Sequence, residues 1–88
     1  MITKDRPIQH GDAKENLDNI AGYWNEYLRS KYDVPPVLNG KNVSIMMTLL
    51  KIGRISTPSA SHNEDNYVDA VGYLAIAGEE ADREETGR

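Results

Sequence analysis

Three stretches of this chain place apolar residues at helical spacing, and no stretch alternates apolar and polar residues for long with the period of a strand. The stretches predict helices over about residues 12–31, 43–55 and 62–82. In the first of them the apolar positions are Leu17, Ile20, Ala21, Trp24, Tyr27 and Leu28. The predicted fold class is therefore all-α, with a three-helix unit.

Capping residues mark the beginnings of these stretches. Asp12 suits the N-cap of the first helix, and Glu15, three residues later, completes a start that resembles a capping box. Asn42 is the predicted cap of the second helix. Ser61 and Glu64 have the spacing of a capping box at the start of the third. Proline, glycine and asparagine residues fill the two breaks between the helices, where they favour turns.

The second stretch is apolar around more than half of its circumference, which is typical of a central helix that neighbours touch on two sides. Its apolar residues are Val43, Ile45, Met46, Leu49, Leu50 and Ile52. In the third stretch, helical spacing predicts a buried face that is widened on one side. That predicted face consists of Val68, Val71, Leu74, Ala75 and Gly78, with Tyr67 and Ala70 beside it.

Length and composition limit the size of the core. A chain of 88 residues forms one domain at most. We expect an extended N-terminal arm over 1–11, a single helical domain over 12–82 and a frayed tail over 83–88. Hydrophobic residues make up 39% of the chain and phenylalanine is absent, so the core is expected to be thin. Self-association would enlarge it, and we expect a helical-bundle homo-oligomer.

Charge and cysteine content exclude several functional classes. Fourteen acidic residues against ten basic ones give a formal charge of −4, and no run of basic residues occurs, so we expect no nucleic-acid partner. The absence of cysteine excludes a disulfide framework, a thiolate zinc site and a cysteine nucleophile. No apolar run approaches the roughly 20 residues that a membrane helix needs, so we expect no membrane insertion.

A short pattern occurs twice, in residues 15–23 and again in residues 65–73. Each copy begins with an acid, an asparagine and an apolar residue, and ends in a Gly-Tyr pair. A glycine inside a helix costs about 1 kcal/mol relative to alanine, so each copy predicts that another backbone approaches closely. Helical geometry places both glycines away from the chain's own core. The interface candidates are Gly22, Glu26, Asp69, Gly72, Tyr73 and Ile76; the alternative is that both stripes are solvated helix faces.

Two pairs of acidic residues have the spacing of ligands for a divalent cation. Members of each pair lie about one turn apart, and oxygen ligands suit Mg²⁺, which makes magnesium the candidate ion. Lys51 and Arg54 of the second helix would bind phosphate oxygens beside such an ion. The alternative is structural: acids near helix starts suit the helix dipole, and the two cations pair with them. The candidate metal ligands are Glu15, Asp18, Asp65 and Asp69.

Three segments within residues 10–78 carry a resemblance to a known family. They are His10-Gly11-Asp12 with Glu15-Asn16 and Trp24, the run from Met46 to Ile52, and Asp65-Asn66-Tyr67-Val68-Asp69-Ala70-Val71-Gly72-Tyr73. In these segments the chain resembles a family of small, uncharacterised phage and prophage proteins. That family is distantly similar to MazG-like all-α nucleoside triphosphate pyrophosphohydrolases and to phage domains associated with nucleotide modification. The resemblance implies a phage origin, a helical oligomeric fold and the handling of nucleotides.

MazG-like enzymes hold magnesium with a Glu-x-x-Glu pair on one helix and a Glu-x-x-Asp pair on another. The positions of this chain that match best are Glu15-x-x-Asp18 and Asn66-x-x-Asp69. Asp18 is shorter than the glutamate of the family pattern, and Asn66 lacks the charge of the glutamate that it replaces. Both differences weaken the binding of magnesium that the resemblance implies.

Two functions follow from the sequence. The first is a small phage-encoded accessory protein that acts by binding, with a degenerate MazG-like site for a nucleotide and Mg²⁺; turnover there would be pyrophosphohydrolysis. The second is a non-enzymatic phage effector that binds and modulates a host protein through an exposed helix face. Both functions place the protein in the cytoplasm of the host cell, and both include a homo-oligomer.

Overall fold

The computed structural model describes residues 10–57 and 64–86, and in these ranges the chain is helical apart from the connecting segment 33–39 and Thr57. Helix α1 spans His10–Tyr32, α2 spans Gly40–Ser56 and α3 spans Glu64–Thr86. The described ranges contain no strand. The prediction of an all-α chain with three helices is therefore confirmed.

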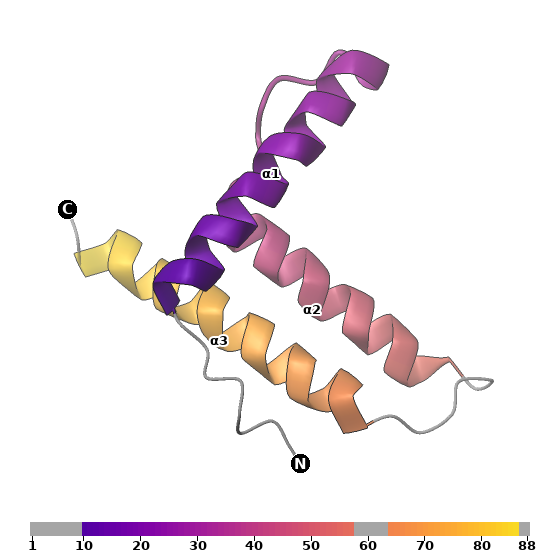
Figure 1. Cartoon of the computed structure of the whole chain (residues 1–88), viewed down its shortest axis with the longest axis vertical. Helices are drawn as coiled ribbons and strands as arrows, with labels where there is room; N and C mark the ends of the chain where they lie inside the picture. Colours follow the sequence, from indigo (N-terminus) through magenta and orange to yellow (C-terminus); the bar gives the residue numbers. More distant parts are fainter. Residues whose placement is uncertain (1–9, 58–63, 87–88) are drawn as a thin grey trace.

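Helices α2 and α3 lie side by side and antiparallel, and we call this pair the hairpin (Figure 1). Three contacts fix its register. Lys41 Nζ lies 2.7 Å from Glu84 Oε1, Ser44 Oγ donates a hydrogen bond to the carbonyl of Tyr73 at 2.6 Å, and Arg54 Nε donates to Asn66 Oδ1 at 3.0 Å. The partner in α3 moves toward its N-terminus as the residue in α2 moves toward its C-terminus, as antiparallel packing requires.

The contact between α2 and α3 is made by small side chains. Ser44 and Thr48 of α2 are buried, as is Ala77 of α3. The hydroxyl of Thr48 donates to the carbonyl of Ser44 at 2.9 Å, so both buried hydroxyls are paired with backbone oxygens. Because these side chains are short, the two helix backbones approach closely enough for a side chain of one to reach the backbone of the other.

Helix α1 crosses the hairpin near the first turns of α2, and its C-terminal half extends beyond the hairpin (Figure 1). It contacts α2 much more extensively than α3. The crossing forms the core, in which Leu17, Ala21 and Val43 are buried. The partly buried side chains packed against these three are Ile20, Trp24, Leu38, Met47, Tyr73 and Ile76.

The large apolar residues of α2 and α3 do not form the buried faces that their spacing predicts. Ile45, Met46, Leu49, Leu50 and Ile52 of α2 are exposed, as are Tyr67, Val68, Val71, Leu74, Ala75 and Gly78 of α3. The prediction for α3 is wrong because the small and polar stripe, not the large apolar one, faces α2. The prediction that α2 is covered on two sides holds only for its stripe of Val43, Ser44, Met47 and Thr48.

Several predicted boundaries differ from the observed ones. Helix α1 begins at His10, inside the predicted arm, and α3 continues to Thr86, inside the predicted tail. Helix α2 begins three residues early because Asn39, not Asn42, is its N-cap. The two asparagines form a reciprocal capping box: Asn39 Oδ1 accepts from the backbone of Asn42 at 2.9 Å, and Asn42 Oδ1 accepts from the backbone of Asn39 at 3.0 Å. The rest of the arm, over 1–9, and the predicted cap Ser61 lie outside the described residues.

Asn25 fastens the connection between α1 and α2 to the side of α1. Its Oδ1 accepts hydrogen bonds from the backbone N–H groups of Val37 and Leu38 at 3.2 and 3.0 Å, and its Nδ2 donates to the carbonyl of Leu38 at 2.9 Å. The chain turns back just before this point at Asp33, which ends α1 with a φ of 60°. Asn25 thereby holds the segment that leads into α2 against α1.

The Asn25→Ala substitution tests this attachment. It removes three hydrogen bonds to the connecting segment, so we expect it to lower the free energy of unfolding by about 1–3 kcal/mol. Asn19→Ala, on an exposed position of the same helix, is the matched control and should change it by less than about 0.5 kcal/mol. Urea unfolding at equal protein concentration measures both, and equal midpoints for the two variants would contradict the assignment.

Candidate functional site

Asp18, a predicted metal ligand, binds the start of α2. Its Oδ1 accepts a hydrogen bond from the backbone N–H of Gly40 at 3.1 Å, and its Oδ2 lies 2.8 Å from the Nζ of Lys14. The first turn of a helix carries free N–H groups and a partial positive charge, both of which a carboxylate satisfies. The pKa of Lys14 is raised, because its ammonium donates a hydrogen bond to Asp18 and lies beside that negative charge.

Gly40 is required for this contact. A Cβ added at position 40 would lie 2.3 Å from Asp18 Oδ1 and 3.3 Å from the backbone nitrogen of Asp18. The absence of a side chain therefore lets α1 approach the first turn of α2. At the other glycines whose surroundings the structure describes, which are Gly22, Gly53, Gly72 and Gly78, an added Cβ would meet no atom within 4 Å. The repeated sequence pattern did not indicate the close approach at Gly40.

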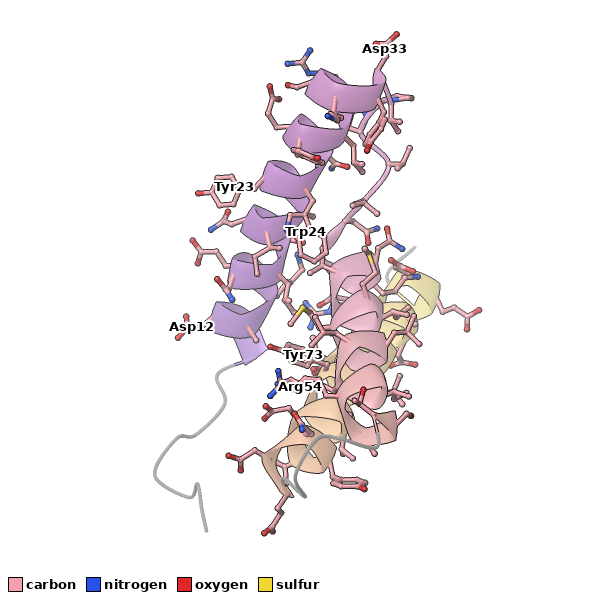
Figure 2. The ribbon with its side chains drawn as sticks, turned by 90° about the vertical axis from the view of Figure 1, so that its right-hand side faces the viewer. Asp12, Tyr23, Trp24, Asp33, Arg54 and Tyr73 are labelled. Atoms are coloured by element: carbon pink, nitrogen blue, oxygen red, sulfur yellow. The ribbon has the colours of Figure 1, made fainter. Side chains whose placement is uncertain are left out.

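The two predicted phosphate-binding cations are engaged by α3. Lys51 Nζ lies 3.1 Å from Asp69 Oδ2, and only 18% of the Lys51 side chain is exposed. Arg54 donates to the side chain of Asn66, which is buried. Arg54 and Tyr73 lie on the side of the hairpin that faces the beginning of α1 (Figure 2). Lys51 thus forms an ion pair with an acid of the third helix, as the structural alternative has it, whereas Arg54 binds a neutral amide.

The structure does not bring the four candidate carboxylates together. Asp18 contacts α2 at Gly40 and Asp69 contacts it at Lys51, eleven positions later, which is about 16 Å along a helix. Glu15 is exposed on α1 and Asp65 is exposed in the first turn of α3, where an acid suits the dipole. Among the side chains that the structure describes, no group of three acidic or histidine residues is arranged to hold a metal ion.

The glycine stripe of the first copy faces outward. Gly22 and Glu26 are exposed, and Tyr23, with 74% of its surface accessible, points away from the hairpin, whereas Trp24 lies on the side of α1 that packs on α2 (Figure 2). The Arg29 guanidinium donates a hydrogen bond to Glu26 and thereby lowers the pKa of that carboxyl. We call Asn19, Gly22, Tyr23 and Glu26 the α1 outer face.

The stripe of the second copy is only partly exposed, and Ile76 does not face outward as predicted. Tyr73 and Ile76 pack against the core between α1 and α2, and Gly72 and Asp69 are half-buried beside them. A Cβ added at Gly72 would meet no described atom within 4 Å apart from its chain neighbours and the backbone of its own helix. The two copies therefore share a sequence pattern but occupy different environments, because α3 turns its Gly-Tyr side toward α1.

Comparisons with known proteins place the chain in a family. The family described as Domain of unknown function (DUF6378) matches residues 1–81. The chain is also 36% identical, over 76 residues, to the Gene 55 protein of Mycobacterium phage L5; the alignment covers 86% of this chain and 44% of that protein. The chain thus spans less than half the length of this curated relative. No solved structure is significantly similar to it.

These comparisons confirm the resemblance to uncharacterised phage proteins, whereas the similarity to MazG-like enzymes stays a prediction. None of the three helices, as far as the structure describes them, combines the length and the apolar character that crossing a bilayer requires. The described polar residues of the candidate site form ion pairs and hydrogen bonds within the chain, and apolar and aromatic side chains are exposed on the helices.

Substitution of Asp18 separates a structural from a metal-binding role. Asp18→Ala removes the bond to the start of α2 and should lower the free energy of unfolding by about 1–2 kcal/mol, as the loss of a cap does. Glu15→Ala is the control from the same candidate pair and should change it by less than about 0.5 kcal/mol. Thermal unfolding with and without Mg²⁺ and a nucleoside triphosphate measures both roles.

If these acids held magnesium, a saturating ligand at about 100 times its Kd would add roughly 2.7 kcal/mol to the stability. We expect no such increase for the wild-type chain. A rise in Tm with Mg²⁺ and nucleotide that both Asp18→Ala and Glu15→Ala abolish would contradict the structural role and restore the nucleotide site.

Proposed function

We propose, from the premise that this chain belongs to the family described as Domain of unknown function (DUF6378), that it is a small phage-encoded accessory protein that binds a host protein in the host cytoplasm. The proposed contact is the α1 outer face. A degenerate nucleotide site is the weaker candidate, because its candidate residues make three separate internal contacts: Asp18 with Gly40, Lys51 with Asp69, and Arg54 with Asn66.

The observation that carries this proposal is the exposure of Tyr23 beside Gly22. Tyr23 is the most exposed large hydrophobic residue of the described chain, at 74%. Tyrosine is enriched in protein interfaces, because its ring buries a large area at a small cost in entropy and its hydroxyl stays available for hydrogen bonding. The Tyr23 side chain points away from the hairpin, so none of the described helices covers it (Figure 2).

Gly22 supports the same surface. Nothing lies within 4 Å of a Cβ added there, so the chain's own fold does not require a glycine at this position. A glycine in a helix nevertheless costs about 1 kcal/mol relative to alanine. A partner helix that packs against the backbone at Gly22 would account for that cost, because the missing side chain allows close approach of two helices.

Gly22→Ala tests whether stability is exchanged for binding at this position. We expect the variant to be more stable than the wild type by about 0.5–1 kcal/mol, because alanine favours the helix. Gly53→Ala is the matched control, since Gly53 is also helical, exposed and open at its Cβ position. Thermal or urea unfolding measures the gain, and a loss of stability in Gly22→Ala would show that the glycine serves the chain's own fold.

Affinity capture tests the binding itself. The tagged chain is incubated with the lysate of a mycobacterium, because the relative described above comes from a Mycobacterium phage. We expect one host protein to be retained in stoichiometric amount, and Tyr23→Ala to bind it at least about 10-fold more weakly, as the loss of an aromatic anchor does. Gly22→Leu should also lose it, whereas Gly53→Ala should retain it. Equal retention by Tyr23→Ala, or no specific retention, would contradict the proposal.

A further inference from the structure

Each helix of the hairpin has a side that none of the described helices covers. Around α2, Val43 and Met47 pack on the side of α1, and Ser44 and Thr48 lie toward α3. Helical geometry places Ile45, Leu49 and Ile52 on the side of α2 opposite Val43 and Met47. Around α3, Tyr73 and Ile76 face α1 while Ala77 is buried against α2. The far sides of both helices meet along the hairpin and form one surface turned away from α1.

This surface is apolar. We call its central residues the hairpin face: Ile45, Leu49 and Ile52 of α2, with Val71 and Leu74 of α3. Met46, Tyr67 and Val68 border it. These eight side chains are each between 40% and 69% exposed, so together they present an area on the order of the roughly 800 Å² per partner that a stable protein interface buries.

The hairpin face carries no charge. Between Asn42 and Gly53 the one charged residue is Lys51, and between Asn66 and Gly78 the one charged residue is Asp69. These two form an ion pair with each other, at the contact between α2 and α3. An apolar, uncharged surface of this extent is unusual on a monomer in water, where contiguous apolar patches rarely exceed a few hundred Å².

The core of a single chain is small in comparison. Among the described residues, the buried hydrophobic side chains are Leu17, Ala21, Val43 and Ala77, and the largest fully buried ones are Val43 and Ser44. More large apolar side chains are thus exposed on the hairpin than are buried in the core. A domain of this length depends on every buried residue for its stability, so the hairpin face is the principal unused source of burial.

We propose that a second copy of this chain covers the hairpin face, so that two hairpins pack against each other as a four-helix bundle. In a two-fold contact each surface meets an identical surface. A charged face would set like charges against each other, whereas an uncharged apolar face is complementary to itself. Surfaces that bind a different protein commonly use charged groups to select that protein over others. The hairpin face has no charged group.

The packing of two hairpins also explains the arrangement within one. Four antiparallel or parallel helices enclose a core of large apolar residues, while the contacts at the edges of such a bundle tolerate small ones. Here the contact between α2 and α3 contains Ser44, Thr48 and Ala77, and the large residues lie on the side where the second copy would be. The inference does not depend on the proposed function, because the α1 outer face is on a different helix.

The first experiment measures the mass of the full chain in solution by light scattering and sedimentation equilibrium. We expect two chains for the wild type. Val71→Glu places a charge at the centre of the hairpin face and should raise the dissociation constant of the dimer by roughly 100-fold or more, because two unpaired carboxylates would be buried. Tyr23→Glu is the control on the α1 outer face and should leave the dimer intact.

A second measurement covers the case in which Val71→Glu fails to fold. The Tm of a folded dimer rises with protein concentration, whereas that of a monomer does not. The wild-type Tm should rise with concentration if the pair of hairpins is the stable unit. A single-chain mass with a Tm independent of concentration would overturn the proposal and leave the face to another occupant. So would a dimer that Val71→Glu leaves intact and Tyr23→Glu dissociates.

Discussion

The close contact between α2 and α3 through small side chains is the constraint on which the rest of the structure depends. Ser44 is fully buried and donates its hydroxyl to a backbone carbonyl of the facing helix, which is possible only when the two backbones lie close together. A helix contacts each neighbouring helix through a different side of its surface. Small residues occupy the side of α2 that faces α3. The large apolar residues of α2 are thereby directed to its other sides, and α1 covers only a part of these.

The number and type of the elements could be predicted from the sequence, because helical periodicity is a local property. The side of each helix that faces the core could not be predicted. A wheel built on the largest apolar stripe turned α3 so that Val71 and Leu74 faced inward, and the structure turns that stripe outward. The assumption that failed is that the largest apolar face of a helix packs within its own chain. The start of α2 was missed because Asn39 and Asn42 are both good caps, and only the reciprocal bonds between them decide which one ends the connection.

The candidate site divides in a similar way. The types of its residues are evident from the sequence, but their convergence depends on the angle at which α1 crosses the hairpin, which no periodicity encodes. That crossing brings Asp18 to the first turn of α2, where it accepts a hydrogen bond from Gly40. Asp69 instead forms an ion pair with Lys51, so the two carboxylates make separate structural contacts. That Lys51 pairs with an acid of α3 could be inferred from charge, whereas the bond of Arg54 to the neutral side chain of Asn66 could not. The contacts of Asn25 with the connecting segment could not, since an asparagine within a helix has no pattern that reveals its partner.

The two exposed surfaces lie on different parts of the molecule, and their separation has a consequence for binding. The hairpin face is turned away from α1, and the α1 outer face lies on the helix that crosses the opposite side of the hairpin (Figures 1 and 2). A second copy on the hairpin face would therefore leave both α1 outer faces accessible and hold them at a fixed distance in one rigid body. A partner with two matching sites would then be bound more tightly than one contact allows, because the second contact forms within the same complex. In this arrangement the hairpin face would form the dimer and the α1 outer face would bind the partner. Neither contact requires catalytic groups to converge, which agrees with the separate contacts of Asp18 and Asp69.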